Sequence, residues 1–146
     1  MVAEDGSLNG PFNAFLLAPG VGAAVQELGS AIRFRSDLCE RSREIAILVV
    51  AAEWNSDFER DSHEAIARSL GITEAELGGI RKHNFSMLNE GEALIAEVTR
   101  QLLAGDLDDH QWKKATKHLR TSTLFELSTL VGYYSMLALQ LRVFRV

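Results

Sequence analysis

The fold of this chain is decided by residues 38–68, which have the sequence LCERSREIAILVVAAEWNSDFERDSHEAIAR. Residues 38–54 are predicted to form a helix, and the apolar run at 45–52 leaves that helix without a polar face, so we expect it to be buried. A polar connection at residues 55–57 follows, and a second helix is predicted to run on to about Arg68. So short a connection predicts a central antiparallel helix hairpin.

The rest of the chain is also predicted to be helical. Prolines occur only at positions 11 and 19, so no proline interrupts a helix after that point. Apolar periodicity and the Gly, Ser, Thr and Asp residues between the periods predict further helices over residues 11–17, 21–34, 73 onward, 89–103, 109–119 and from 121 or 122 towards the end. We therefore predict one all-α domain covering residues 1–146.

Capping residues mark two of these helix starts. Ser36 and Asp37 offer side-chain oxygens for the helix that begins near residue 38. Thr73 and Glu76 match the capping box, in which a hydroxyl and a carboxylate bind each other's backbone amides.

The composition favours a folded domain that acts on a small-molecule substrate. The chain has 146 residues, 47% hydrophobic and 24% charged, and its 15 Lys and Arg against 20 Asp and Glu give a net charge of −5. It has no long run of like charges, so we expect neither nucleic acid nor a membrane as a partner. The first residues match neither a secretory signal nor a transit peptide, which predicts a cytoplasmic protein.

The last helix predicts self-association. Its apolar residues leave almost no polar face: Leu124, Leu127, Leu130, Val131, Met136, Leu137, Leu139 and Leu141. One small domain cannot cover such a helix on all sides, and large exposed apolar patches are rare on monomers, so we expect a homo-oligomer.

Four polar residues of the hairpin are candidates for chemistry: Glu44, Ser56, Glu59 and His63. The last three are spaced three and four residues apart, so they share one helix face. At 1.5 Å per residue, Glu44 lies about 15 Å before the turn and His63 about 9 Å after it, which brings the two within reach. A buried carboxylate beside an imidazole is the usual material of general acid and base catalysis.

The same residues have other interpretations. A Glu and a His on facing helices often form a buried pair that only fixes the packing, and spacing does not decide between that role and catalysis. A metal site built from Glu44, Glu59 and His63 is a weaker alternative, because the Glu-x-x-His spacing of di-iron bundles is absent. Arg60 and Glu64 are assigned to a solvated helix face.

Binding residues are less well defined. Four aromatic residues could line a pocket, although such residues more often belong to the core: Trp54, Phe58, Tyr133 and Tyr134. Four arginines could hold a substrate carboxylate, and spacing selects none of them: Arg33, Arg35, Arg41 and Arg43. The chain has no phosphate-binding loop, nucleophile elbow or dinucleotide-binding pattern, so we predict no cofactor.

The sequence of the hairpin resembles that of the carboxymuconolactone decarboxylase family, which includes the alkylhydroperoxidase AhpD-like proteins. In AhpD-like members the motif looks like a Glu, a C-x-x-C pair beginning twelve residues later, and a His four residues after the second Cys. Glu44, Ser56, Glu59 and His63 have the same spacings. Two cysteines are thus replaced by a hydroxyl and a carboxylate, neither of which can act as a thiolate or close a disulfide.

The resemblance extends over most of the chain. It is most specific over residues 41–81, and segments at 5–13 and 126–134 look like the decarboxylase-type branch. It implies an AhpD-like helical fold and a homo-oligomer, either a trimer or a hexamer. The one cysteine, Cys39, lies seventeen residues before Ser56.

Three functions follow as hypotheses. The first is a cofactor-free carboxymuconolactone decarboxylase-like enzyme, a carboxy-lyase or an isomerase, that transfers protons on a small carboxylated or lactone substrate. His63 would be the general acid and base, Glu44 would orient it, and Glu59 would be a second carboxyl; substrate would be bound by Ser56, Trp54, Phe58 and Tyr133. The second is a non-catalytic ligand-binding oligomer on the same scaffold, and the third is AhpD-like peroxiredoxin activity.

Overall fold

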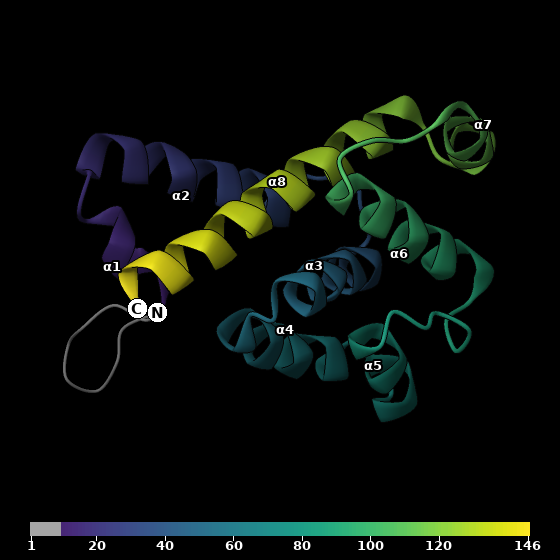
Figure 1. Cartoon of the computed structure of the whole chain (residues 1–146), viewed down its shortest axis with the longest axis horizontal. Helices are drawn as coiled ribbons and strands as arrows, with labels where there is room; N and C mark the ends of the chain where they lie inside the picture. The colour runs from purple at the N-terminus through teal and green to yellow at the C-terminus, as the bar shows by residue number, and fades with distance from the viewer. Residues whose placement is uncertain (1–9) are drawn as a thin grey trace.

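The computed structural model describes residues 10–146, and the regular secondary structure in that range is entirely helical (Figure 1). The helices are α1 (Pro11–Phe15), α2 (Pro19–Phe34), α3 (Glu40–Trp54), α4 (Asp57–Ser69), α5 (Glu74–Arg81), α6 (Glu90–Leu103), α7 (Asp109–His118) and α8 (Thr121–Phe144). The predicted all-α class is therefore confirmed. The expectations for the start of the chain and for most of segment 5–13 lie outside the described residues.

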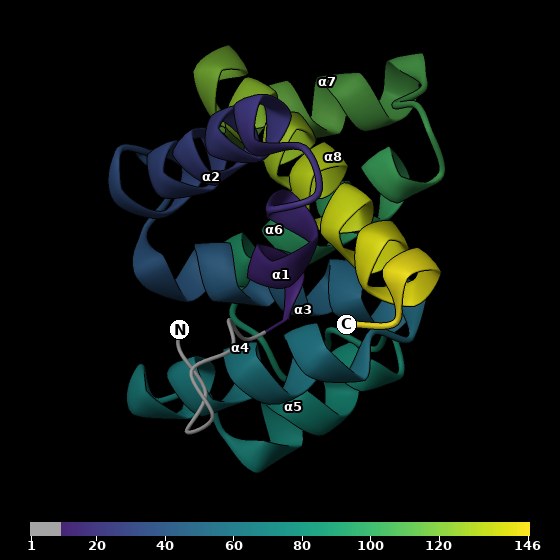
Figure 2. The ribbon, with the colours of Figure 1, turned by 90° about the vertical axis from the view of Figure 1, so that its left-hand side faces the viewer.

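Helix α3 is the centre of the fold. Every residue from Glu44 to Ala51 is buried, and the helix contacts α4, α5, α6 and α8. In Figures 1 and 2 it lies between α8 on one side and α4 and α5 on the other. Its side chains enter two hydrophobic clusters, one shared with α8 and one shared with α5, because a helix without a polar face needs cover on all sides.

Asn55 ends α3 and produces the hairpin. Its backbone is left-handed, with a φ of 49°, a conformation that asparagine tolerates better than most residues. The Ser56 amide donates to the Ala51 carbonyl at 3.0 Å and the Asn55 amide to the Ala52 carbonyl at 3.3 Å, which is the paired bonding of a Schellman motif. Helix α4 begins at Asp57, so α3 and α4 pack against each other as the predicted hairpin.

The start of α3 differs from the sequence expectation. The helix begins at Glu40 with Cys39 at the capping position, so the prediction that Ser36 or Asp37 caps it is wrong. The Ser36 hydroxyl donates instead to the Glu126 carboxylate at 2.8 Å, and the Asp37 amide donates to the same group at 3.1 Å. The two residues therefore tie the α2–α3 connection to α8.

Two further helix starts show how local signals act. Helix α2 begins at Pro19, slightly before the expected residue 21, because the fixed φ of proline suits the first helical position. The capping box of Thr73 and Glu76 is present at the start of α5, as predicted.

Glu64 is buried, so its assignment to a solvated face is wrong. Its carboxylate accepts hydrogen bonds from Arg81 of α5 at 2.6 and 2.5 Å and from Arg68 at 3.0 Å. Arg60 pairs with other carboxylates of α4 at the surface. A partner seventeen residues away on another helix cannot be recognised from spacing within one helix, and this pairing fixes α5 against α4.

The outer face of α8 carries exposed apolar side chains. Phe125 is 72% exposed, and Leu139 and Val143 are also exposed. They recur at intervals of fourteen and four residues, so they lie along the same side of the helix. Within the described residues, none of the helices is long and apolar enough to cross a membrane.

Candidate functional site

The hairpin brings Glu44 of α3 and His63 of α4 into direct contact. His63 Nδ1 lies 2.6 Å from Glu44 Oε2, and the Glu44 side chain is only 3% exposed. The other oxygen, Oε1, lies 3.8 Å from Nε of Arg43. The carboxylate therefore has an imidazole on one side and a guanidinium group on the other.

This contact assigns roles to the two ring nitrogens of His63. A carboxylate only accepts hydrogen bonds, so the proton is assigned to Nδ1, which donates to Glu44. Nε2 is then left with a lone pair and can accept a proton from a substrate. The His63 ring also packs edge-on against Tyr134, with 5.3 Å between ring centroids, which further restricts its orientation.

Glu44 and His63 belong to the wall of a cavity of about 410 Å³, which is within the size range of small-molecule sites. Its apolar wall is mostly aromatic and includes Phe12, Phe15, Phe34, Phe58, Tyr133, Tyr134, Ile66 and Leu137. Its polar groups are Arg33, Arg43, Glu44, Glu59, Ser62 and His63. Helices α1, α2, α3, α4 and α8 all contribute, so distant segments of the chain meet here.

Glu59 is the second carboxyl of the cavity. It is 3% exposed, and neither of its oxygens makes a hydrogen bond of good geometry with the described residues, although the Ser56 hydroxyl is close enough to favour the charged form. Burial raises the pKa of this carboxyl to about 7, and the Ser56 hydroxyl offsets only part of that effect. At neutral pH a large fraction of Glu59 is therefore protonated and able to donate a proton.

Tyr133 and Tyr134 of α8 form part of the aromatic wall of the cavity. Burial raises the pKa of both hydroxyls, against the opposing charge of Arg33, so both remain protonated at neutral pH. Tyr133 is placed by a close approach to α2, because a Cβ built on Gly29 would lie only 2.1 Å from its hydroxyl oxygen. Glycine at this position lets the tyrosine pack directly against the helix backbone.

Two residues expected to bind substrate do not line this cavity. Trp54 lies at the end of α3, where the Arg142 guanidinium stacks on its ring at 5.6 Å and donates a hydrogen bond to its carbonyl. Ser56 is buried in the turn and reaches the site only through Glu59. Phe58 and Tyr133, expected for the same role, do line the cavity.

The structure separates the four candidate arginines. Arg41 is bound to Glu76 and Glu92 at 2.6 and 2.5 Å, and Arg35 pairs with Glu27 at the surface. Arg33 and Arg43 line the cavity. The sequence could not separate Arg41 from these two, because its ion-pair partners belong to α5 and α6 and are brought to it by folding.

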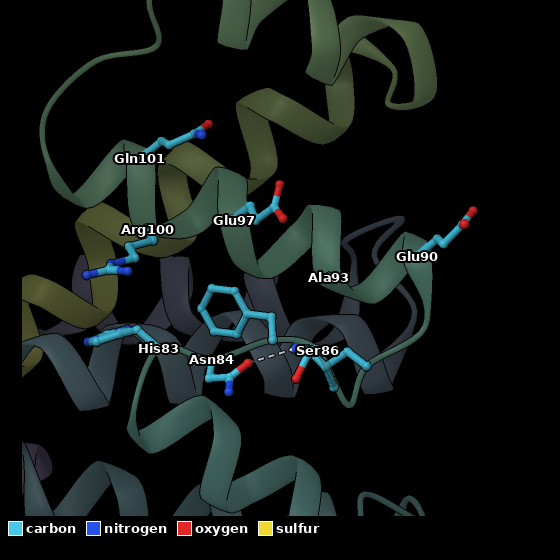
Figure 3. A pocket seen from close by; sticks show the side chains of 10 residues that line it. His83, Asn84, Ser86, Glu90, Ala93, Glu97, Arg100 and Gln101 are labelled. Carbon is cyan, nitrogen blue, oxygen red and sulfur yellow. Dashed lines mark hydrogen bonds between the residues drawn. The ribbon is translucent and has the colours of Figure 1, made fainter.

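A larger depression of about 730 Å³ lies between α6 and the connection from α5 (Figure 3). None of the predicted site residues lines it. Figure 3 shows His83 and Arg100 extending towards the same end, and His83 Nε2 lies 3.3 Å from Glu53. This contact is longer than that of Glu44 and His63, and the Glu53 side chain is half exposed and does not line the depression, so we take the aromatic cavity as the candidate site.

The geometry also bears on the metal alternative. Over residues 10–146, no three or more His, Cys, Asp and Glu side chains are grouped in a way that could hold a metal ion. Glu44, Glu59 and His63 line the same cavity, but the facing atoms of Glu44 and His63 are hydrogen-bonded to each other and are not arranged around a common point.

Fold and site together define a class of protein, an all-α domain whose central hairpin presents a Glu–His pair and a second buried carboxyl to an aromatic cavity. The chain belongs to the carboxymuconolactone decarboxylase family, whose model matches residues 19–104, more than half of its length. The matched range includes Glu44, Glu59 and His63, whereas Tyr133 and Tyr134 lie beyond it. A search of curated proteins finds no match to this chain.

Proposed function

We propose that this protein is a cofactor-free enzyme of the carboxymuconolactone decarboxylase type, a carboxy-lyase or an isomerase that transfers protons on a small carboxylated or lactone substrate. The observation that carries the proposal is the 2.6 Å contact between His63 and Glu44 in the wall of the aromatic cavity. A carboxylate that orients an imidazole makes it an effective general base. Family membership is consistent with this chemistry.

In a decarboxylation, the bond between the carboxylate carbon and its neighbour breaks, CO₂ leaves, and the electron pair stays on the remaining carbon, delocalised into an adjacent carbonyl. That carbon then takes a proton from the neutral Glu59 carboxyl, and His63 relays a proton from solvent to restore Glu59. In an isomerisation, His63 Nε2 removes a proton beside a carbonyl and Glu59 returns one to another carbon. Neither reaction needs an oxidant or a reductant.

The remaining cavity residues bind the body of the substrate. Phe58, Tyr133 and Tyr134 offer flat apolar surfaces to an unsaturated or cyclic compound. Ser56 acts through Glu59, and Trp54 has no contact with the substrate.

Two alternatives use the same scaffold. A non-catalytic ligand-binding oligomer would use the aromatic cavity without the proton transfer. Peroxiredoxin activity of the AhpD-like kind would require a thiolate in the cavity, but Cys39, the one cysteine, is exposed before α3, with its sulfur 3.1 Å from the Ser42 hydroxyl. The sulfur does not line the cavity, so we place this activity third.

The enzyme is proposed to work in the cytoplasm as a homo-oligomer, a trimer or a hexamer. The exposed apolar side chains of α8 support self-association, because Phe125, Leu139 and Val143 form one face that no part of the described chain covers.

The experiment is a turnover screen with small lactone acids and unsaturated carboxylates, followed by CO₂ release and proton NMR. We expect the wild type to convert one of them, and His63→Ala to lower the rate at least about a hundredfold at a temperature where circular dichroism shows the variant to be folded. His118→Ala, at an exposed histidine of α7, is the matched control and should keep full activity.

Each other outcome favours a different function. Full activity in His63→Ala would overturn the proposal. Binding without turnover across the panel would favour the ligand-binding oligomer. Peroxide consumption with a thiol reductant, abolished in Cys39→Ser, would favour the peroxiredoxin alternative.

A further inference from the structure

The aromatic cavity has an excess of positive charge in a protein whose net charge is −5. Arg33 and Arg43 both line it, and the carboxylate of Glu44 neutralises only one of them. Glu59 contributes no charge when protonated, and His63 is neutral when Nδ1 alone carries a proton. While Glu59 is protonated, the cavity therefore has one positive charge without a counter-charge, which an anionic ligand would supply.

Arg43 is largely buried. Its side chain is 12% exposed, and its Nε is buried with no hydrogen-bond partner in the described part of the chain. The 3.8 Å to Glu44 Oε1 is too long for a hydrogen bond. A buried donor without a partner is unfavourable, so an acceptor placed beside Arg43 would gain a charge-assisted hydrogen bond.

Arg33 is the second cation that lines the cavity. Its Nε donates to the Gly29 carbonyl at 3.2 Å, and its guanidinium lies 5.7 Å from the centre of the Phe34 ring. Its charge opposes the rise in pKa that burial causes at Tyr133 and Tyr134. The guanidinium is therefore close enough to influence groups inside the cavity electrostatically.

We propose that Arg43, assisted by Arg33, binds a carboxylate of the ligand, and that ligands of this site combine one such carboxylate with a flat unsaturated or aromatic body. The inference deepens the proposed function. Its account of the reaction rests on that function, whereas its account of how the ligand binds does not. Four features carry it: the partnerless Nε of Arg43, the excess positive charge, the aromatic walls and the size of the cavity.

The bound carboxylate is not the one that reacts. A guanidinium group stabilises the charge of a carboxylate, which opposes its loss as CO₂. The carboxylate at Arg43 therefore stays in place throughout, and the carbon that exchanges a proton is the one presented to His63 and Glu59. Arg43 is in this sense a specificity-determining residue of the site.

The test compares benzoate with benzamide, which have nearly the same shape but differ in charge. Dissociation constants are measured by isothermal titration calorimetry at pH 7 on the wild type, Arg43→Gln and Arg43→Lys. Arg35→Gln is the matched control, because Arg35 pairs with Glu27 and does not line the cavity. Circular dichroism and the thermal midpoint show whether each variant is folded.

We expect the wild type to bind benzoate more tightly than benzamide by about tenfold to a hundredfold, the range of a charge-assisted hydrogen bond. Arg43→Gln should lose most of that preference without weakening benzamide, Arg43→Lys should retain part of it, and Arg35→Gln should retain all of it. Equal binding of the two probes, no binding of either at millimolar concentration, or an unchanged preference in Arg43→Gln would overturn the inference.

The two proposals fail in different ways. Benzoate selectivity that depends on Arg43, in a protein without turnover, would contradict the proposed function and leave the binding inference standing. Turnover that depends on His63 but not on Arg43 would support the proposed function and contradict the binding inference.

Discussion

Replacing Glu59 by glutamine changes how the stability of the protein depends on pH. Burial raises the pKa of Glu59 from its ordinary 4.5 to about 7 in the folded state. Below pH 4.5 the carboxyl is protonated in both the folded and the unfolded state, and it adds no pH dependence. Between pH 4.5 and 7 the unfolded chain loses this proton and the folded protein keeps it, so the free energy of unfolding falls as the pH rises.

The size of the effect follows from the difference between these two pKa values. At about 1.4 kcal/mol per pH unit, Glu59 costs the wild type about 3 kcal/mol at pH 8 relative to pH 4. For a chain of this length that corresponds to about 6 to 12 °C in the thermal midpoint. Glutamine carries no ionisable group, so the variant lacks this decline.

The assay is thermal unfolding followed by circular dichroism at several pH values from 4 to 8. A buried amide has unsatisfied hydrogen-bonding groups of its own, so the quantity compared is the difference between Glu59→Gln and wild type as a function of pH. That difference should shift in favour of the variant by about 3 kcal/mol between pH 4 and 8. Glu97→Gln, which removes a carboxylate of α6 that pairs with Lys114 at the surface, is the matched control. A constant difference for Glu59→Gln would refute the reasoning.

Three further sets of substitutions test the turn, the packing of Tyr133 and the outer face of α8. Asn55→Ala places alanine at a φ of 49° and should lower the free energy of unfolding in urea by about 1 kcal/mol. Asn55→Gly should not lower it, and equal losses in the two variants would contradict the role given to the left-handed turn. Gly29→Ala puts a Cβ 2.1 Å from the Tyr133 hydroxyl and should lower the free energy of unfolding by about 1–3 kcal/mol. The control Gly78→Ala, whose Cβ meets nothing within 4 Å, should be neutral or stabilising. An unchanged melting midpoint in Gly29→Ala would show that Tyr133 is not held against α2. Phe125→Ser combined with Leu139→Ser should reduce the molar mass measured by light scattering, and a wild type that is already monomeric at micromolar concentration would exclude this face as an interface.

The hairpin could be predicted because its signals are local. Each signal acts within a few residues: the apolar run at 45–52, the polar turn at 55–57 and the spacing of Glu59 and His63. The helical rise per residue then predicts that Glu44 and His63 lie within reach of each other across the turn. The fold confirms the hairpin, and the 2.6 Å contact follows from it.

The rest of the site could not be predicted, because it depends on contacts between distant segments. The choice of Arg43 and Arg33 depends on folding, since Arg41 is taken up by Glu76 and Glu92 from two other helices. Outside the site, the burial of Glu64 likewise depends on Arg81 of α5, a partner that spacing within α4 does not indicate. The sequence predicts that Trp54 binds substrate because it is aromatic and lies near the turn, but its ring lies outside the cavity and stacks with Arg142.

The central claim, that His63 oriented by Glu44 transfers protons in this cavity, is tested most directly by running the turnover reaction in D₂O and measuring deuterium in the product by mass spectrometry. We expect the wild-type product to gain one solvent deuterium at the carbon beside its carbonyl, and Glu44→Gln and His63→Ala to form this product at least about a hundredfold more slowly. Product formed by His63→Ala at the wild-type rate with the same deuterium content would contradict the claim.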